Sequence, residues 1–217
     1  MDLWCIGLNR SQATICATNQ RVFRSAILPL ARIYRVDIVF RMRRLNECFA
    51  TGTLFLDVKS LDQNTCAQVF SKKVGFNATY QTVLLTGDSL GYLYRAFCRD
   101  CGIPEHLKFD SYSSQVGRNT LFTKTVRKYY TRYPVSNPCR TNENPAEVSI
   151  IELKKRWYLI MHKKKNSEQV WGYGLVWISE TGNLSVSNSH YVSGRTHLEY
   201  ITGDTPDTSE YLGLNFL

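Results

Sequence analysis

The sequence predicts an α/β domain with a mixed β-sheet, and three observations support this. Short runs rich in Val, Phe, Tyr and Leu follow one another with turn residues between them. Amphipathic helical segments then alternate with further short strands. The composition, 43% hydrophobic and 21% charged over 217 residues, is that of an ordinary globular chain. A chain of this length can bury a sizeable core as one domain with an appendage.

The first 46 residues are expected to form a basic arm or linker rather than a domain. Residues 11–25 predict a short helix with Ser11 or Asn9 as its cap, and Pro29 ends that pattern. Little apolar periodicity follows, and residues 41–46 are expected to be a basic connector. The core then spans 47–185, and 186–217 form a C-terminal extension.

The expected core begins with three consecutive antiparallel strands at residues 54–58, 66–72 and 79–85. Turn residues at 62–64 and 75–77 separate these strands. The elements that follow alternate in type and are expected at residues 89–101 (helix), 106–109 (strand), 120–130 (helix) and 132–135 (strand). Two later helices are expected at 169–182 and 196–202.

A long amphipathic helix is expected to begin at Ala146. Its apolar stripe recurs three and four residues apart, at Ile150, Leu153, Trp157, Ile160 and Met161. Glu147 stands on the first turn, where a carboxylate suits the positive end of the helix dipole. At about 100° per residue, Lys154 lies almost directly above Glu147. An ordinary solvated helix face would also explain this charge pattern.

This order of strands and helices is that of an RNase H-like domain, a mixed sheet flanked by helices. In that layout Asp110 ends the fourth strand and Glu147 starts a helix that packs across the sheet, so the two carboxylates are expected to converge. Convergent carboxylates at a strand end suit divalent cations, which drive in-line phosphoryl transfer. Alternatively, Asp110 caps a turn and Glu147 simply favours a helix N-terminus.

The charge favours a polyanionic partner, because the net charge is +9 and the sequence pI is about 9.2. The cations up to Arg44 are all arginines, and a second cluster covers residues 154–165. No apolar run approaches the roughly 20 residues of a membrane span, and no signal peptide is evident. We therefore expect a soluble intracellular protein without a membrane partner or a small-molecule cofactor.

The cysteines and tryptophans are expected to be structural. Seven scattered cysteines indicate a reducing compartment. Cys98 and Cys101 form a C-x-x-C pair that could begin a zinc site, but no second pair follows, which favours small buried cysteines. Trp157, Trp171 and Trp177 lie on apolar stripes and are expected in the core rather than as platforms for bases.

Several segments occur together in the order found in one known family: RRLNECF, VKSLDQNTCAQVF, CGIPEHLKFD, GRNTLFTKTVRKY, NENPAEVSIIELKKRW, WGYGLVWISE and GRTHLEYITGDTPDTSEYL. With these segments the sequence resembles the integrase region of a copia-type retrotransposon polyprotein, as a degenerate fragment. The resemblance implies an RNase H-like core that uses an Asp, Asp, Glu triad with Mg²⁺ or Mn²⁺. It also implies that DNA is the partner, that copies of the chain associate, and that a functional protein works in the nucleus.

The resemblance and the basic cluster on the helix together assign roles to seven residues. Asp110 matches the second aspartate of the triad and Glu147 the glutamate, so both are expected to be catalytic and to bind the metal. The residues expected to bind nucleic acid are the helix cations Lys154, Lys155, Arg156, Lys163 and Lys164.

The first aspartate of the family pattern is missing, because Gly52 occupies its place. The nearest replacement, Asp57, is five residues further on, which on a strand means the opposite face and about 16 Å along the chain. We interpret the sequence as a retrotransposon-derived integrase core whose DNA strand transfer is impaired. A non-catalytic DNA-binding module and an unselected retroelement relic remain the alternatives.

Overall fold

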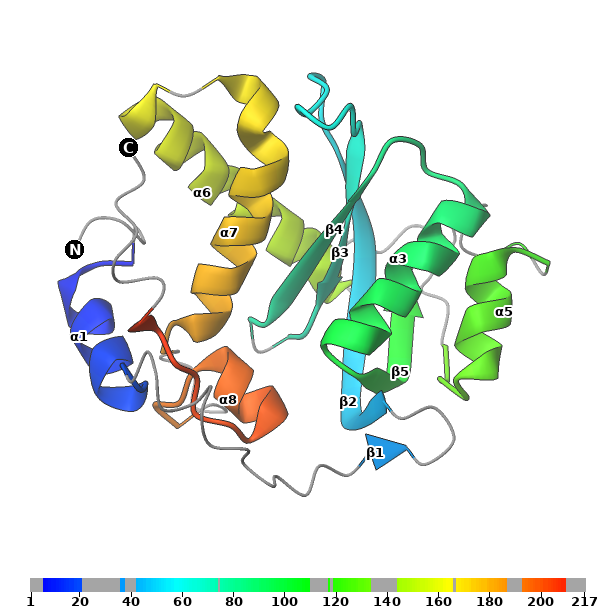
Figure 1. The fold of residues 1–217 in the computed structure, drawn as a ribbon, viewed down its shortest axis with the longest axis horizontal. Helices are drawn as coiled ribbons and strands as arrows, with labels where there is room; N and C mark the ends of the chain where they lie inside the picture. The colour runs from blue at the N-terminus through cyan, green and yellow to red at the C-terminus, as the bar shows by residue number, and fades with distance from the viewer. Residues whose placement is uncertain are drawn as a thin grey trace.

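The computed structural model describes residues 6–20, 36–37, 42–73, 75–109, 117, 119–133, 144–165, 167–186 and 193–209. Within this part of the chain, a β-sheet is covered by helices on both faces (Figure 1). The helices α6 (Pro145–Lys164) and α7 (Trp171–Leu184) lie on one face. The other face is covered by α3 (Gly87–Asp100), against which α5 (Leu121–Lys128) packs.

The sheet is mixed, which confirms the predicted fold class. Strands β2 (Met42–Phe55), β3 (Cys66–Ser71) and β4 (Asn77–Thr82) form an antiparallel meander. Strand β5 (Ile103–Phe109) pairs parallel with β2, from Arg44 opposite Ile103 to Thr51 opposite Phe109. The short β1 (Val36–Asp37) pairs with the start of β2. A mixed sheet in this order with helices on both faces is the RNase H-like fold.

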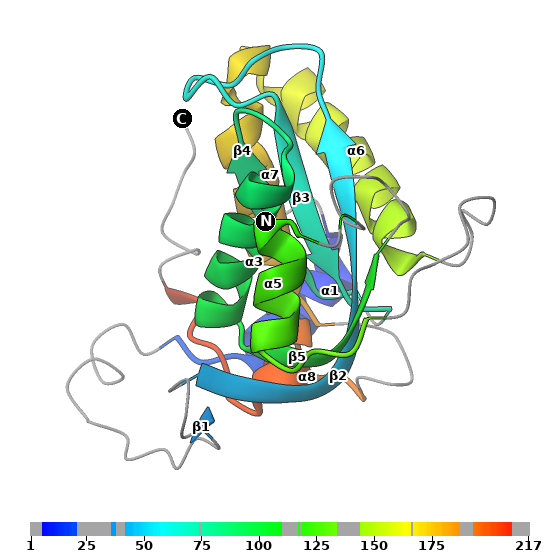
Figure 2. The same cartoon turned by 90° about the vertical axis from the view of Figure 1, so that its right-hand side faces the viewer.

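The strand β2 starts at Met42, twelve residues before the position expected from the sequence, so the expected basic connector is wrong from Met42 onward. Its long curved course is visible in Figure 2. The sequence pattern does not predict this part of the strand, because Arg43 and Arg44 stand where apolar residues would indicate a strand. Both are satisfied by carbonyls of distant segments: Arg44 Nη2 donates to the Tyr129 carbonyl at 2.9 Å, and Arg43 donates to the Thr202 carbonyl. Sequence periodicity does not report such partners.

The helix α1 (Leu8–Ala17) begins before the expected residue 11 and ends at Ala17, and residues 21–25 of the expected helix lie outside the described residues. This part of the expected arm contacts the expected C-terminal extension. Asn19 N donates to the Pro206 carbonyl at 2.9 Å, and Thr208 N donates to the Asn19 carbonyl at 2.8 Å. Near this contact lies the short helix α8 (His197–Thr202) (Figure 1).

The remaining expected helices are confirmed, with small shifts at their ends. The segment expected at 169–182 is a 3-10 turn, η3 (Glu168–Val170), followed directly by α7. Of the strand expected at 132–135, Arg132 makes a single bridge to His106, and residues 134–135 lie outside the described part. None of the described helices is long and apolar enough to cross a bilayer.

Two buried clusters fill the space on either side of the sheet. On the α3 side, Phe70 stacks on Phe97 with ring centroids 4.5 Å apart. On the α6 side, Val69 packs with Ile150 and Trp157. Adjacent residues of β3 therefore face opposite clusters, as the period of a strand requires. The tryptophan prediction is confirmed: Trp157 and Trp171 are buried, and Trp177 packs against the same cluster.

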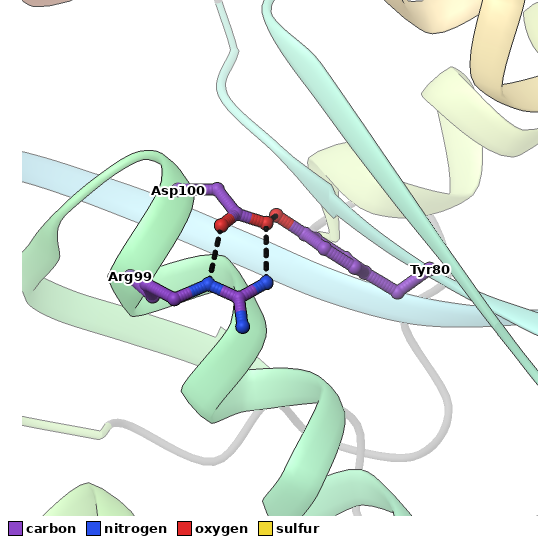
Figure 3. Close-up of polar contacts among 3 residues, drawn as sticks. All are labelled: Tyr80, Arg99 and Asp100. Atoms are coloured by element: carbon purple, nitrogen blue, oxygen red, sulfur yellow. Dashed lines mark hydrogen bonds and ion pairs between the residues drawn. The ribbon is translucent and has the colours of Figure 1, made fainter.

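The end of α3 is held to β4 by a polar contact (Figure 3). The Asp100 carboxylate accepts a hydrogen bond from the Tyr80 hydroxyl at 3.1 Å and pairs with Arg99 Nε at 2.8 Å. Beside it, Cys98 is fully buried and Cys101 partly buried, as expected for small structural cysteines. Burial raises the pKa of the Cys101 thiol to about 12, so this thiol stays protonated at neutral pH.

Candidate functional site

Gly52 lies on the face of β2 that α6 covers. In the sheet, Gly52 is paired with Val69 and Leu54 is paired with Ala67. Leu54, Ala67 and Val69 all belong to the buried cluster on the α6 side. Thr51 and Thr53, the residues on either side of Gly52, hydrogen-bond to the Gln68 side chain and so face the other way. The alternation of the strand therefore directs position 52 toward α6.

Position 52 stands directly opposite Glu147. A Cβ atom at this position would lie 3.4 Å from Glu147 Oε1, 3.2 Å from Ala146 Cβ and 3.0 Å from Ile150 Cδ1. The first turns of α6 thus approach the strand so closely that a side chain at position 52 would be tightly packed. The position that the resemblance assigns to the first aspartate and the glutamate that it assigns to the triad are neighbours in space.

Asn144 fixes the start of α6 on the strand. Its side chain is 4% exposed, and its Oδ1 accepts a hydrogen bond from Ala146 N at 3.1 Å. Its Nδ2 donates to the carbonyl of Thr51, the residue before Gly52, at 3.4 Å. The apolar spacing that predicts this helix starts at Ala146 and does not identify Asn144 and Pro145. An N-cap asparagine followed by proline at the first helical position was the signal that could have identified them.

Asp110 lies outside the described residues. The last described residue of β5, Phe109, is paired with Thr51, so β5 ends one residue before the level of Gly52. The convergence of Asp110 with Glu147 therefore stays a prediction.

A metal centre needs several oxygen or nitrogen ligands close together. Among the described residues, no three His, Cys, Asp or Glu side chains are grouped so that they could hold a metal ion. Around position 52 these residues offer one carboxylate, Glu147, facing a glycine. This donor set does not fit a two-metal site.

The nearest alternative carboxylates lie elsewhere. Asp57 lines a cavity of about 170 Å³ together with Trp157 and Tyr158. Trp157 is ten residues beyond Glu147, which corresponds to about 15 Å along the helix. The other nearby carboxylate, Asp62, accepts a hydrogen bond from the Tyr173 hydroxyl at 3.2 Å. Neither residue takes the place of the missing ligand.

The basic residues of α6 do not share one face. Lys154, seven residues after Glu147, lies on the same side of the helix and is partly exposed. Lys155 and Lys163 are exposed, and the side chain of Lys164 lies outside the described part. Arg156 instead lines a cavity between α6 and α1. The structure therefore groups Lys154, but not Arg156, with Glu147.

No protein-family model matches the chain, and no curated protein matches it by sequence. Its fold resembles solved structures. Two are of the HTLV-2 integrase catalytic core domain in complex with magnesium. The trimeric form has a TM-score of 0.56 at 14% identity, covering 72% of this chain and 97% of that chain. The dimeric form has a TM-score of 0.54 at 12% identity, covering 74% and 97%.

A third similar structure is a chain of the simian T-cell lymphotropic virus intasome in complex with PP2A regulatory subunit B56 gamma. Its TM-score is 0.53 at 15% identity, and the match covers 71% of this chain. The chain spans about half the length of that intasome chain, 55%. At these identities the likeness establishes the fold alone: the mixed sheet and flanking helices are arranged as in an integrase catalytic core domain.

Proposed function

We propose that this chain is an integrase core of retrotransposon type that binds nucleic acid and is impaired in metal-dependent DNA strand transfer. The observation that carries the proposal is the position of Gly52, whose missing side chain faces the Glu147 carboxylate. The fold of the magnesium-bound HTLV-2 cores and the ordered copia-type segments support the family assignment. The dimeric and trimeric forms of those cores support self-association as part of the proposal.

The impairment follows from the chemistry of the site. A carboxylate at position 52 would help to hold the two metal ions that, in enzymes of this kind, stabilise the entering and leaving oxygens. A glycine at position 52 supplies no oxygen for this purpose. Glu147, and Asp110 as the residue after Phe109, are the proposed ligands for Mg²⁺ or Mn²⁺, and without a carboxylate at position 52 they are too few for a two-metal centre. We expect the loss of one metal ligand to lower the rate by orders of magnitude, and each tenfold loss corresponds to about 1.4 kcal/mol of transition-state stabilisation.

A non-catalytic DNA-binding module is the second candidate. The absence of a carboxylate at position 52 favours this candidate. It is also favoured by the surface of α6, which carries Lys154, Lys155 and Lys163 together with Tyr158, which is 64% exposed. Arg156 and Lys164 are also proposed to bind DNA. On this second reading the chain keeps its affinity for DNA, and the carboxylates have only structural roles.

The decisive experiment restores the missing ligand in a form that fits. Because a side chain at position 52 would meet Ile150 Cδ1, Gly52→Asp is combined with Ile150→Val, which removes that atom. We expect no Mg²⁺- or Mn²⁺-dependent strand transfer by the natural chain on a branched DNA substrate, and measurable transfer by the double variant.

Gly52→Asn with Ile150→Val is the matched control, since it has nearly the same shape without the charge, and it should stay inactive. Adding Glu147→Gln to the active variant should abolish transfer. If the natural chain itself transfers strands and loses this activity with Glu147→Gln, another residue supplies the ligand and the proposed impairment is wrong. If the double variant folds but stays inactive, the second candidate is favoured.

A further inference from the structure

A second site is indicated by a cavity of about 480 Å³ between α6, α1, α8, the end of α7 and the turn that joins β3 to β4. Its charged lining consists of Arg10, Lys72, Lys73, Arg156 and Glu152. On α6 it involves Ser149, Glu152 and Arg156, whereas Ala146 and Ile150 contact Gly52. The cavity is therefore on a different face of the helix from the Gly52–Glu147 pair. It is separate from the proposed strand-transfer site, and Arg156 is the residue that it shares with the cations proposed to bind DNA.

The cations of this cavity are not all neutralised from within the protein. Lys72 is balanced, because its Nζ lies 2.7 Å from Glu47 Oε1. Arg156 has no hydrogen bond or ion pair within the described part of the chain. Arg10 uses its Nε to donate to the Val186 carbonyl at 2.6 Å. Burial lowers the pKa of Arg10, and the nearby positive charge of Arg156 lowers it further, against an opposite effect of Glu152. Two guanidinium groups thus share one space with a single carboxylate.

A buried histidine completes the lining. His197, at the start of α8, is 6% exposed, and its Nδ1 is buried without a hydrogen-bond partner among the described residues. Its ring lies against Gly75, where a Cβ atom would be 2.8 Å from Cε1. Burial, and then the charges of Arg10 and Arg156, lower the pKa of His197 to about 4, so the ring is neutral at pH 7. A neutral imidazole can donate one hydrogen bond to an anion.

We propose that this cavity binds a phosphate group, as inorganic phosphate or as part of a small phosphate ester, with Arg10, Arg156 and His197 as its principal contacts. A phosphate dianion has enough acceptor oxygens for both guanidinium groups and the imidazole, and arginine matches its geometry in a bidentate manner. A single carboxylate ligand would leave part of this donor set unpaired. The volume lies within the range of small-molecule sites, so an ester fits as well as the free ion.

The test measures binding of inorganic phosphate to the full chain by isothermal titration calorimetry, at pH 7.5 and with ionic strength held constant with chloride. We expect saturable binding, weakened about tenfold by Arg156→Gln because a charged hydrogen-bond donor is lost. Lys128→Gln is the matched control, since it removes the same charge from an exposed residue of α5, beyond the other face of the sheet, and should leave the affinity unchanged. A parallel titration with adenosine monophosphate distinguishes the sources: tighter binding than phosphate indicates an ester, and equal or weaker binding indicates the free ion.

A second readout follows His197 itself. Bound phosphate is a monoanion in the acidic range where this ring titrates, and its negative charge still stabilises the imidazolium form. Saturating phosphate should therefore raise the pKa of His197 above its value of about 4, as measured by NMR of the ring carbons. The shift should be absent at the same phosphate concentration in Arg156→Gln. The proposal is overturned if phosphate shows no saturable binding, if Lys128→Gln weakens it as much as Arg156→Gln, or if the His197 resonance does not respond.

Discussion

At the scale of single residues, Gly52 controls how closely α6 approaches the sheet. The sequence revealed that a carboxylate is missing at this position, since the surrounding segments resemble those of a family that has one. It could not reveal that the helix has filled the space. That fact depends on the distances from position 52 to Ala146 Cβ and Ile150 Cδ1, 3.2 and 3.0 Å, which belong to a segment nearly a hundred residues away.

We therefore expect Gly52→Ala to destabilise the protein. The added methyl group overpacks the contact with α6, at a cost of about 1–3 kcal/mol. Reduced freedom of the unfolded chain offsets about 0.4–1 kcal/mol of this. The measurement is the free energy of unfolding from urea denaturation, for the natural chain, Gly52→Ala, Ile150→Val and the double variant.

The double variant provides the control. Ile150→Val alone should cost about 0.5–1.5 kcal/mol as a buried deletion. If Gly52→Ala and Ile150→Val touch the same contact, the double variant is more stable than the sum of the single effects predicts. Strict additivity would show that position 52 does not meet Ile150.

At the scale of elements, α6 is the part of the chain that the sequence describes best. The apolar spacing predicted a helix from Ala146 and its buried seam, and the helix spans Pro145–Lys164 with Leu153 and Trp157 buried. The direction of Arg156 could not be predicted in this way. It depends on α1 and α8, which line the same cavity as Arg156. The segments around Asn19 and Thr208 come together there, and this contact leaves no trace in local periodicity.

The N-cap of α6 should matter more than an ordinary cap. Asn144→Ala removes both the hydrogen bond to Ala146 N and the one to the Thr51 carbonyl, which is itself buried beside Gly52. Loss of a cap costs about 0.5–2 kcal/mol, and we expect the upper half of that range, measured by thermal or urea denaturation.

Asn144→Asp separates the two contributions, because aspartate can still accept from Ala146 N but cannot donate to Thr51. This variant should keep most of the stability that Asn144→Ala loses, since the cap and the helix dipole both favour a carboxylate there. Equal losses in the two variants would instead assign the effect to the bond with Thr51.

At the scale of the whole molecule, the succession of elements was sufficient to predict the RNase H-like sheet. The three antiparallel strands follow one another along the chain, so their pairing needs only short turns. The start of β2 was missed because Arg43 and Arg44 are satisfied by carbonyls of Thr202 and Tyr129, far along the chain. Local patterns therefore predicted the parts of the fold made by neighbours in sequence, and failed where distant segments meet.

The net charge of +9 and the exposed cations of α6 lead to the last prediction, which concerns DNA. Binding should be independent of sequence and should weaken steeply with salt, because neutralised phosphates release their counterions. Fluorescence anisotropy with two unrelated duplexes, between about 50 and 200 mM NaCl, measures both properties.

Lys154→Gln should weaken binding to both duplexes and reduce the slope of log K against log salt by about 0.9, the value for one phosphate contact. Lys128→Gln carries the same change of net charge on the α5 side of the sheet and should leave the slope nearly unchanged. Equal effects of the two variants would show that only the overall charge acts, and binding that does not depend on salt would contradict a phosphate-binding surface on α6.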